Sequence, residues 1–578
     1  MKKENFIWSS TKVGLLAGAV GIFLSLIGMV EIFNKRDVIE KVITLGMFLL
    51  VASGFLAGYI ASRRTSDLLG ENKAVSNLLA GLIAGLSTGL VLTLFVLSSN
   101  VVNLRTVFIN ATPPLFQLLT FGRGAGGAWL LTVYGAILGL LGGGFLLIPQ
   151  IFRRPVTRAI FFMIFLALFS GLFRVILINQ GDGVERIAKF LFSQTGMTIN
   201  GALIFFFGII AASMFWSSRG GVIQEKVDGL PRTGKISLRV LGFIVLAYIV
   251  LILPQVSGPF IAQVIVIISL YILMGLGLNI EIGFAGLLDL GFVAFYAIGA
   301  YTVGLLTSYG EYGLQHVSFW VAVPIAVLVS MFFGGLLGLP VLGVRGDYLA
   351  IATLGFGEII RLLAGSDYMA KYLGGPRGII GIQKPCIGFL EPFIRVDVPR
   401  ICNGIELGKP ENIYYIAIFS AILIAFISWR LRESRLGRAW MAIREDEDVA
   451  EALGVNLIQS KILAYMLGAA FAGLGGAIFA TLVGSIFATS MQLIVSINVV
   501  ALIIVGGMGS IPGVIVGAIA LIGLPELLRE VSEFRFLLYG VALITVMLVK
   551  PEGLWPSQTA LRELHHDDAT NLASEPHP

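Results

Sequence analysis

Charged residues are scarce in this chain. They make up 13% of its 578 residues, about half the share of roughly 25% found in average soluble domains. Hydrophobic residues make up 57%, and a water-soluble chain could not bury that much apolar surface, so lipid must cover part of it. The composition therefore excludes an ordinary soluble enzyme. The net charge is +6, and we assign the basic residues mostly to loops beside a membrane. No nucleic-acid partner is expected.

Cysteine and histidine are also rare. The two cysteines are Cys386 and Cys402, no C-x-x-C motif is present, and three of the four histidines lie in the C-terminal tail. This excludes the common structural metal centres, so no metal and no cofactor are expected. Both cysteines fall in a loop predicted to lie outside the cell. A disulfide and two unrelated free thiols both remain open there.

Long apolar segments are abundant, as is glycine, with 71 residues. Segments of about 17–25 apolar residues are membrane-span candidates, and they predict an all-α, polytopic integral membrane protein with about 14–16 transmembrane or re-entrant helices. Two of the predicted spans are Val240–Leu253 and Phe260–Leu278. Small residues such as glycine let membrane helices approach closely, because packing rather than the hydrophobic effect joins helices in lipid.

The polar stretch Ser217–Arg239 divides the apolar segments into two groups. We expect an N-terminal membrane extension of about six helices over residues 1–220, a cytoplasmic linker over 221–239, a core over 240–556 and a polar tail over 557–578. With the N-terminus inside, Lys and Arg concentrate in the inner loops. This orientation predicts cytoplasmic N- and C-termini, an inner loop at 430–461 and an outer loop at 365–412.

The linker contains a near match to a phosphate-binding loop. Residues 229–236 read GLPRTGKI, whereas the motif G-x-x-x-x-G-K-S/T needs a hydroxyl after the lysine to bind magnesium. Ile236 occupies that position, and the flanking segments are membrane spans rather than a strand and a helix of a soluble fold. The chain is therefore not expected to be an enzyme, and any ATP would be hydrolysed by a separate subunit.

Residues 275–301 combine glycine with costly polar groups. Asn279, Glu281 and Asp289 stand among Gly283, Gly286 and other glycines, too many for an uninterrupted helix. Ionisable residues in membrane segments usually face a bundle interior or a water-filled path, and broken helices expose backbone groups that bind polar solutes. The alternative is that the glycines only permit close packing and that the acids have structural partners.

Several motifs resemble the branched-chain amino acid ABC permeases of the LivM type. They are GFAGLLDLG at 283–291, GVRGDYLAIATLGFGEIIR at 343–361, GGPRGI at 374–379, GGMGSIPG at 506–513 and KPEGLWP at 550–556, and they occur in the family's order over roughly residues 260–556. The resemblance implies that residues 240–556 are an ABC permease core. It also implies a substrate pathway formed by Asn279, Gly283, Ala285, Gly286, Asp289, Gly291 and Glu358. Glu358 and Arg361, three positions apart, could pair across one helical turn.

The inner loop also resembles a family feature, the loop that couples a permease to its ATPase. The residues that carry this resemblance are Trp440, Ile443, Ala450, Glu451, Ala452 and Gly454. A short amphipathic helix bearing Trp440, Ile443 and Leu453 could fit a groove of a soluble ATPase, while its charges fix the register. The alternative is an ordinary solvated loop with arginines beside the membrane.

The resemblance implies a permease subunit of a binding-protein-dependent ABC importer for branched-chain amino acids in a bacterial-type inner membrane. The implied partners are a second permease subunit, ABC ATPase subunits and an extracytoplasmic substrate-binding protein. Urea or short amides are alternative substrates. In a different class, an ion-coupled secondary transporter would use Glu281, Asp289 and Glu358 as coupling sites.

Overall fold

The computed structural model describes residues 2–65, 73–178, 180–229, 231–314, 317–341, 347–387, 405–527 and 535–556. The chain forms two compact units, residues 1–246 and 247–578. Both are built from helices, as the apolar segments predict. The predicted tail at 557–578 and Cys402 lie outside the described residues.

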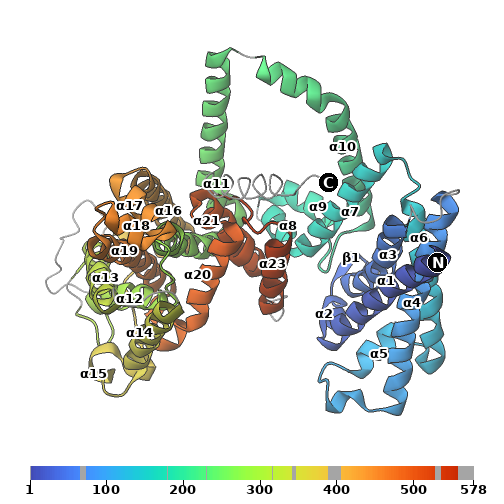
Figure 1. The fold of residues 1–578 in the computed structure, drawn as a ribbon, viewed down its shortest axis with the longest axis horizontal. Helices are drawn as coiled ribbons and strands as arrows, with labels where there is room; N and C mark the ends of the chain where they lie inside the picture. Colours follow the sequence, from blue (N-terminus) through green and yellow to red (C-terminus); the bar gives the residue numbers. More distant parts are fainter. Residues whose placement is uncertain are drawn as a thin grey trace, which may run out of the picture. The chain divides into compact units, whose positions relative to one another are not determined.

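The first unit is a bundle of apolar helices (Figure 1). Its helices are α1 (Lys2–Leu26), α2 (Met29–Phe33), α3 (Leu45–Thr65), α4 (Lys73–Val101), α5 (Pro113–Leu119), α6 (Ala128–Phe145), α7 (Gln150–Leu168), α8 (Ser170–Ile178), α9 (Asp182–Leu191) and α10 (Ile199–Asp228). Strands β1 (Asp37–Ile39) and β2 (Ile43–Thr44) pair antiparallel beside it. Helix α10 and the start of the next helix at Arg232 make most of the predicted linker helical.

Helices α4 and α6 pack through facing rows of glycine. Gly81, Gly85 and Gly89 are spaced by four residues on α4. A Cβ atom at Gly85 would meet the carbonyl of Gly135 on α6, and one at Gly139 would meet the carbonyl of Gly81. Backbones this close require residues without side chains at the contact, which is how membrane helices associate tightly.

Helix α11 (Arg232–Leu278) joins the two spans predicted on either side of residue 258. Its backbone is not straight, because Gly258 has φ +81° and interrupts the helical conformation between Pro254 and Pro259. Proline lacks an N–H donor and clashes with the preceding turn, so two prolines beside a glycine explain the kink. The two predicted segments are thus consecutive, and the break between them lies at this kink.

The helices of the second unit that follow α11 are α12 (Val293–Thr307), α13 (Phe319–Val341), α14 (Asp347–Gly365), α15 (Ala370–Leu373), α16 (Pro410–Arg432), α17 (Arg435–Glu445), α18 (Glu447–Ala452), α19 (Leu457–Val483), α20 (Leu493–Gly506), α21 (Ile511–Ala518), α22 (Leu524–Leu527) and α23 (Arg535–Val549). Helix α19 packs most extensively against α12 and α13 (Figure 1). Helix α19 is rich in small residues, and a Cβ at Gly476 or Gly299 would meet the backbone of the facing helix, α12 or α19 respectively. This helix therefore forms the centre of the core.

Two short antiparallel sheets tie the loops of this unit together. Strand β3 (Ile379–Ile380) pairs with β6 (Ser485–Ile486), and β4 (Cys386–Ile387) pairs with β5 (Ile405–Glu406). Cys386 is buried, and its carbonyl accepts a hydrogen bond of 2.8 Å from the indole N–H of Trp320. Since Cys402 is not described, a disulfide between the two cysteines stays a prediction.

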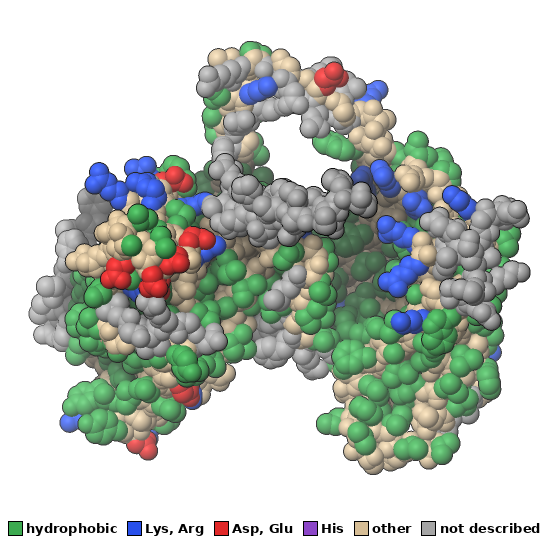
Figure 2. Space-filling model, in the orientation of Figure 1, with side chains coloured by type: hydrophobic (Ala, Val, Ile, Leu, Met, Phe, Trp, Pro, Cys, Tyr) green, Lys and Arg blue, Asp and Glu red, His purple; other side chains and the backbone are tan. Residues whose placement is uncertain are grey.

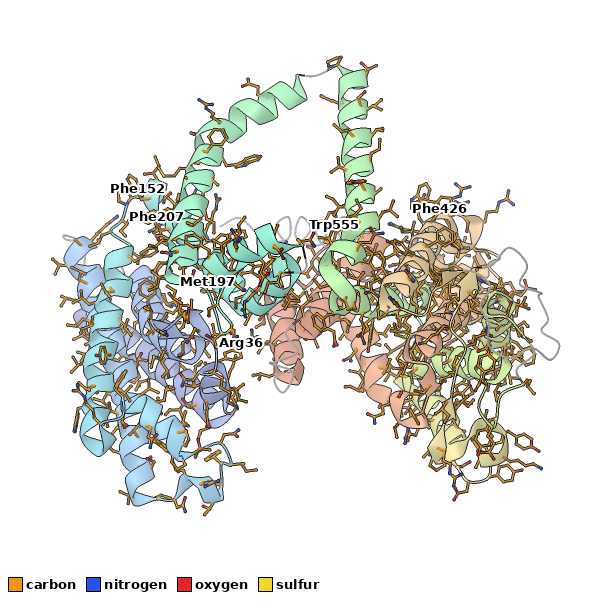
Figure 3. All side chains as sticks on the ribbon, turned by 180° about the vertical axis from the view of Figure 1, so that it is seen from behind. Arg36, Phe152, Met197, Phe207, Phe426 and Trp555 are labelled. Atoms are coloured by element: carbon orange, nitrogen blue, oxygen red, sulfur yellow. The ribbon has the colours of Figure 1, made fainter. Side chains whose placement is uncertain are left out.

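Eleven helices among the described residues are long and apolar enough to cross a membrane, or up to twelve if the bent pair α7–α8 is one span. Two shorter apolar helices, Val293–Thr307 and Ile511–Leu527, bring the total to thirteen, or to fourteen with the bent pair, which meets the lower end of the predicted number. Large apolar side chains on these helices point outward, among them Phe152, Phe207 and Phe426 (Figure 3). The prediction of an all-α, polytopic membrane protein is confirmed.

Candidate functional site

The glycine-rich segment forms a break between α11 and α12. Helix α11 passes into a π-helical turn, Asn279–Phe284, which is followed by a non-helical loop up to Val293. The Asn279 side-chain oxygen accepts a hydrogen bond of 2.9 Å from the backbone N–H of Gly509, in the turn between α20 and α21. A Cβ at Gly283 would meet both of these groups. The turn between α20 and α21 therefore holds the break in place.

Two acids of this segment are fully enclosed by the protein. Glu281 and Asp289 each have 0% exposure, and one Asp289 oxygen accepts a hydrogen bond of 2.7 Å from the N–H of Gly291. The carboxyl groups of Glu281 and Asp289 lie within hydrogen-bonding reach of each other, while the Tyr465 hydroxyl on α19 has no hydrogen-bond partner among the described residues. These groups interact electrostatically with one another. The segment is a buried polar cluster and is closely packed.

The side chain of Glu281 lies directly against the central helix. A Cβ at Gly468 of α19 would fall on one of its carboxyl oxygens. Across the loop, Thr353 of α14 accepts a hydrogen bond of 3.1 Å from the N–H of Leu290. Residues 279–291 thus connect α11, α14 and α19.

The loop between α16 and α19 folds into two short helices. Ser434 caps α17 by accepting from the N–H of Gly437 at 3.3 Å. Asp446 caps α18 by accepting from the N–H groups of Asp448 and Val449, each at 2.9 Å. Both caps satisfy backbone donors that a helix start leaves open. The sequence predicts one short helix here, and the structure divides it at Asp446.

Helix α17 packs against the break after α11. The guanidinium of Arg444 donates a hydrogen bond of 2.9 Å to the carbonyl of Gly283. Gly286 has φ +73°, and a Cβ there would lie 3.0 Å from the Arg444 side chain. Only glycine adopts this backbone and leaves this room readily. This contact joins the two regions that the sequence singles out.

The predicted coupling residues divide into buried and exposed groups. Trp440, with 0% exposure, and Ile443, with 2%, lie inside the unit, and the Trp440 indole donates a 2.8 Å hydrogen bond to the Ser460 carbonyl. Ala450 is buried too, whereas Glu451, Ala452 and Gly454 are exposed. The aromatic side chain expected to reach a partner is an anchor within this chain.

The remaining surface of this loop is charged and partly apolar. Lys, Arg, Asp and Glu side chains gather over α17 and α18 (Figure 2). Between them, Val449 is 54% exposed and Leu453 is 78% exposed. An ion pair of 2.7 Å between Glu447 and the buried Lys461 fixes α18 on α19.

Glu358 does not join the buried acids. It forms a two-point ion pair with Arg361 on α14, as their spacing predicts, with one hydrogen bond of 2.9 Å from Arg361 Nε to Glu358 Oε2. The Glu358 side chain is 41% exposed. Of the predicted pathway residues, Asn279, Gly283, Ala285, Gly286, Asp289 and Gly291 belong to the break, while Glu358 lies on the outer face of α14.

A pocket that the sequence did not reveal lies elsewhere in the second unit. It has a volume of about 230 Å³ and is lined by residues of α11, α12, α19, α20 and α22, including Tyr271, Asn498 and Glu526. Asn498 and Glu526 are polar residues in apolar segments, a signal that could have identified them. Arg444 was also missed, because nothing in the sequence indicates which loop arginine turns inward.

No group of three or more His, Cys, Asp or Glu side chains that could hold a metal ion occurs in the part of the chain that the structure describes. The described residues on either side of the near match to a phosphate-binding loop are helical. That setting differs from the strand and helix that flank a true phosphate-binding loop.

Outward apolar faces on an all-α bundle define an integral membrane protein, and a broken helix in its core with a polar loop seated on the break is an arrangement suited to transport. The chain belongs to the family described as "Branched-chain amino acid transport system / permease component", whose model matches residues 260–549. No solved structure matches the chain.

Individual relatives agree with this family. The chain is 38% identical over 372 residues to the high-affinity branched-chain amino acid transport system permease protein LivM of Salmonella typhimurium, covering 62% of this chain and 84% of the relative. It is 38% identical over 322 residues to LivM of Escherichia coli, covering 53% and 74%. It is 26% identical to the permease protein LivH of Salmonella typhimurium, covering 50% and 91%.

Proposed function

We propose that this chain is a permease subunit of a binding-protein-dependent ABC importer for branched-chain amino acids. The family and the printed names of the LivM relatives support this substrate. Its partners are a second permease subunit, ABC ATPase subunits and an extracytoplasmic substrate-binding protein. Similarity to both LivM and LivH supports a pair of related permeases.

One contact carries the coupling proposal, the hydrogen bond from Arg444 to the carbonyl of Gly283. It links the α17–α18 loop directly to the π-helical turn at the end of α11. An ATPase that moves this loop would therefore move the broken helix. We assign the ATPase contact to Val449, Glu451, Ala452, Leu453 and Gly454, which are exposed.

Trp440, Ile443 and Ala450 then have a supporting role. They are buried and attach the loop to the core, so that force applied at α18 reaches α19 and the break. The residues Asn279 to Gly291 form the moving joint in this scheme. Their close packing favours a role in conformational change over a contact with solute.

The arrangement in the membrane follows from the same scheme. The α17–α18 loop faces the cytoplasm, where ATP is, and both termini lie on that side. The transport core comprises residues 240–556, beyond the linker at 221–239. Residues 1–220 are an N-terminal membrane extension outside the region that the family model matches.

The test is transport by the full complex in proteoliposomes. The ATPases and ATP are on the inside of the vesicles, and the binding protein is on the outside. We expect ATP and the binding protein together to drive uptake of labelled leucine. Unlabelled isoleucine and valine should compete, while urea and acetamide should not. Uptake of urea in place of leucine would overturn the substrate. Uptake by this chain alone, driven by a sodium or proton gradient, would overturn the importer.

A further inference from the structure

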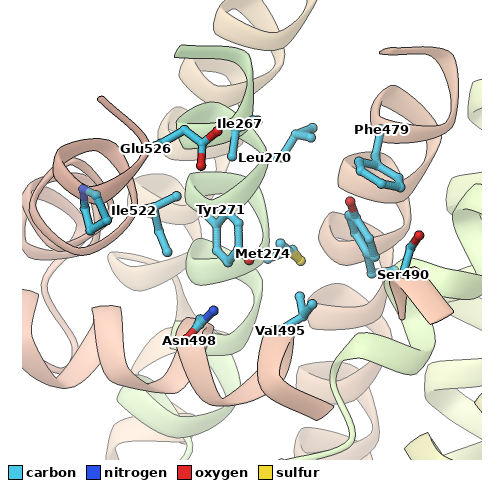
Figure 4. Close-up of a pocket in the computed structure, with 12 residues that line it drawn as sticks. Ile267, Leu270, Tyr271, Met274, Phe479, Ser490, Val495, Asn498, Ile522 and Glu526 are labelled. Atoms are coloured by element: carbon cyan, nitrogen blue, oxygen red, sulfur yellow. The ribbon is translucent and has the colours of Figure 1, made fainter. Parts of the chain in front are cut away.

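The pocket of the second unit combines one acidic group with apolar walls. Glu526 turns its carboxylate into the pocket, and Asn498 lies on the same side, opposite Phe479 and Ser490 (Figure 4). Met274 and Val495 lie between them. Among the described residues that line it, none is Lys or Arg. The pocket therefore favours a small solute that carries a positive charge and an apolar part.

The volume restricts the solute further. At about 230 Å³, the pocket is smaller than the roughly 300–1,000 Å³ of sites for drug-sized ligands. Its polar groups are of the types that bind an ammonium and a carboxylate: a glutamate oxygen accepts from an ammonium, while an amide N–H and a tyrosine hydroxyl donate to a carboxylate. An aliphatic α-amino acid meets each of these requirements.

The pocket is also placed where the coupling loop can act on it. Tyr271 and Met274 belong to α11, whose end is the π-helical turn that Arg444 contacts. Met274 precedes Asn279 by five residues, about 7.5 Å along a helix. The opposite wall includes Ile522, which lies in the second π-helical segment of this unit, Ile519–Gly523. Such segments are frequent at functional sites.

We propose that this pocket is the site that holds the amino acid during passage through the permease. The ammonium binds Glu526, and the carboxylate binds Asn498 and the hydroxyl of Tyr271. The aliphatic side chain packs against Met274, Val495 and Ile522. Tyr271 and Glu526 already interact with groups of the protein, so the bound solute adds to those interactions or replaces them. This inference rests on the proposed substrate class.

The experiment uses the full complex in proteoliposomes and measures uptake of labelled leucine. Loss of a charged hydrogen bond in Glu526→Gln should lower uptake roughly 10- to 100-fold, and Glu526→Asp should restore part of it. Binding-protein-stimulated ATP hydrolysis and assembly of the complex should persist. Glu311→Gln, which changes an exposed glutamate away from the pocket, should transport as the unaltered complex does.

A second variant reads out specificity. Ile522→Ala shortens a side chain of the apolar wall and therefore enlarges the pocket. The ratio of phenylalanine uptake to leucine uptake should rise as a result, which a merely structural role of Ile522 would not produce. Unchanged leucine uptake in Glu526→Gln, or an unchanged ratio in Ile522→Ala, would overturn the pocket assignment alone. Failure of the unaltered complex to carry any aliphatic amino acid would overturn the proposed substrate and, with it, the ligand of this pocket.

Discussion

At the scale of single residues, the buried acid Glu281 allows a requirement for the shape of a side chain to be distinguished from a requirement for its charge. Its side chain is enclosed between α11 and the backbone at Gly468, and its carboxyl group pairs with that of Asp289. An ionised carboxylate in such a place is expensive, whereas a neutral group of the same shape is tolerated. The sequence identified the residue but could not show that protein, rather than solute, surrounds it.

Replacement of Glu281 should therefore depend on charge and shape. Glu281→Gln should change the free energy of unfolding by about 1 kcal/mol or less, because an amide of nearly the same shape still presents a hydrogen-bonding group to Asp289. Glu281→Lys should destabilise by about 3–5 kcal/mol, because it buries an unpaired charge. Thermal unfolding of the purified complex measures both. If Glu281→Gln were as damaging as Glu281→Lys, the carboxylate itself would be needed.

Arg444 provides a test of coupling at the same scale. Arg444→Ala removes the hydrogen bond to Gly283, so ATP hydrolysis should continue while the amount of leucine carried per ATP falls roughly tenfold or more, as expected from a charged hydrogen bond worth about 1.5–3 kcal/mol. The matched control is Arg438→Ala on the same helix, where the guanidinium donates to the nearby Glu433 carbonyl, at 3.0 Å, in an exposed position.

Equal ratios of leucine to ATP in the two arginine variants would contradict a coupling role for the Arg444 contact. A parallel loss of hydrolysis and transport in Arg444→Ala would instead indicate failed attachment of the ATPase. The ratio therefore distinguishes transmission of movement from assembly.

At the scale of secondary-structure elements, glycine determines which helices associate. The α4–α6 seam places backbone against backbone at Gly85 and Gly139. The sequence shows the glycines and predicts close packing, but it does not show which two helices meet. Apolar helices are equally soluble in lipid on every face, so complementary shape and interhelical hydrogen bonds, such as that of 2.8 Å between Thr93 and Thr132, decide the pairing.

Gly139→Leu should force α4 and α6 apart, because its Cβ would meet the backbone of Gly81 and Gly85. Overpacking of this kind typically costs about 1–3 kcal/mol. The expected result is a lower unfolding temperature and faster proteolysis of the first unit. Leu140→Ala, one position along and 41% exposed, is the control and should behave like the unaltered chain. Equal stability of the two variants would show that the seam is not needed.

The two spans predicted on either side of residue 258 illustrate a limit of sequence patterns at this scale. Length and hydropathy predict each span separately, and they placed two spans where the structure has α11 with a kink at Gly258. They do not show that α10 and α11 extend into the polar stretch predicted as a linker, whose role stays a prediction. Local composition reports solubility in lipid, while the direction of a helix after a glycine depends on what packs beside it.

At the scale of the whole molecule, the two compact units divide near the start of the family match. The first comprises residues 1–246, and the family model begins at residue 260. The pocket, the broken helix and the α17–α18 loop all lie in the second unit. Transport is therefore proposed for the second unit, with α11 beginning before it.

Deletion of residues 2–220 should leave leucine uptake by the assembled complex close to that of the full chain. The described α11 remains intact in this variant, because it begins at Arg232. Uptake in proteoliposomes measures the effect, and co-purification with the partner subunits checks assembly. Loss of uptake in an assembled complex would give the N-terminal unit a part in transport.

The sequence by itself determined the solvent, the class and the family of this protein. Apolar content requires lipid, and the motifs between residues 283 and 556 are local enough to be read in order. Only the tertiary structure decided which polar groups come together: Arg444 with the Gly283 carbonyl, Trp440 with the Ser460 carbonyl, and Glu526 with Asn498 in one pocket. The partners belong to different elements, and the pattern of one segment carries no information about which other segment will pack against it.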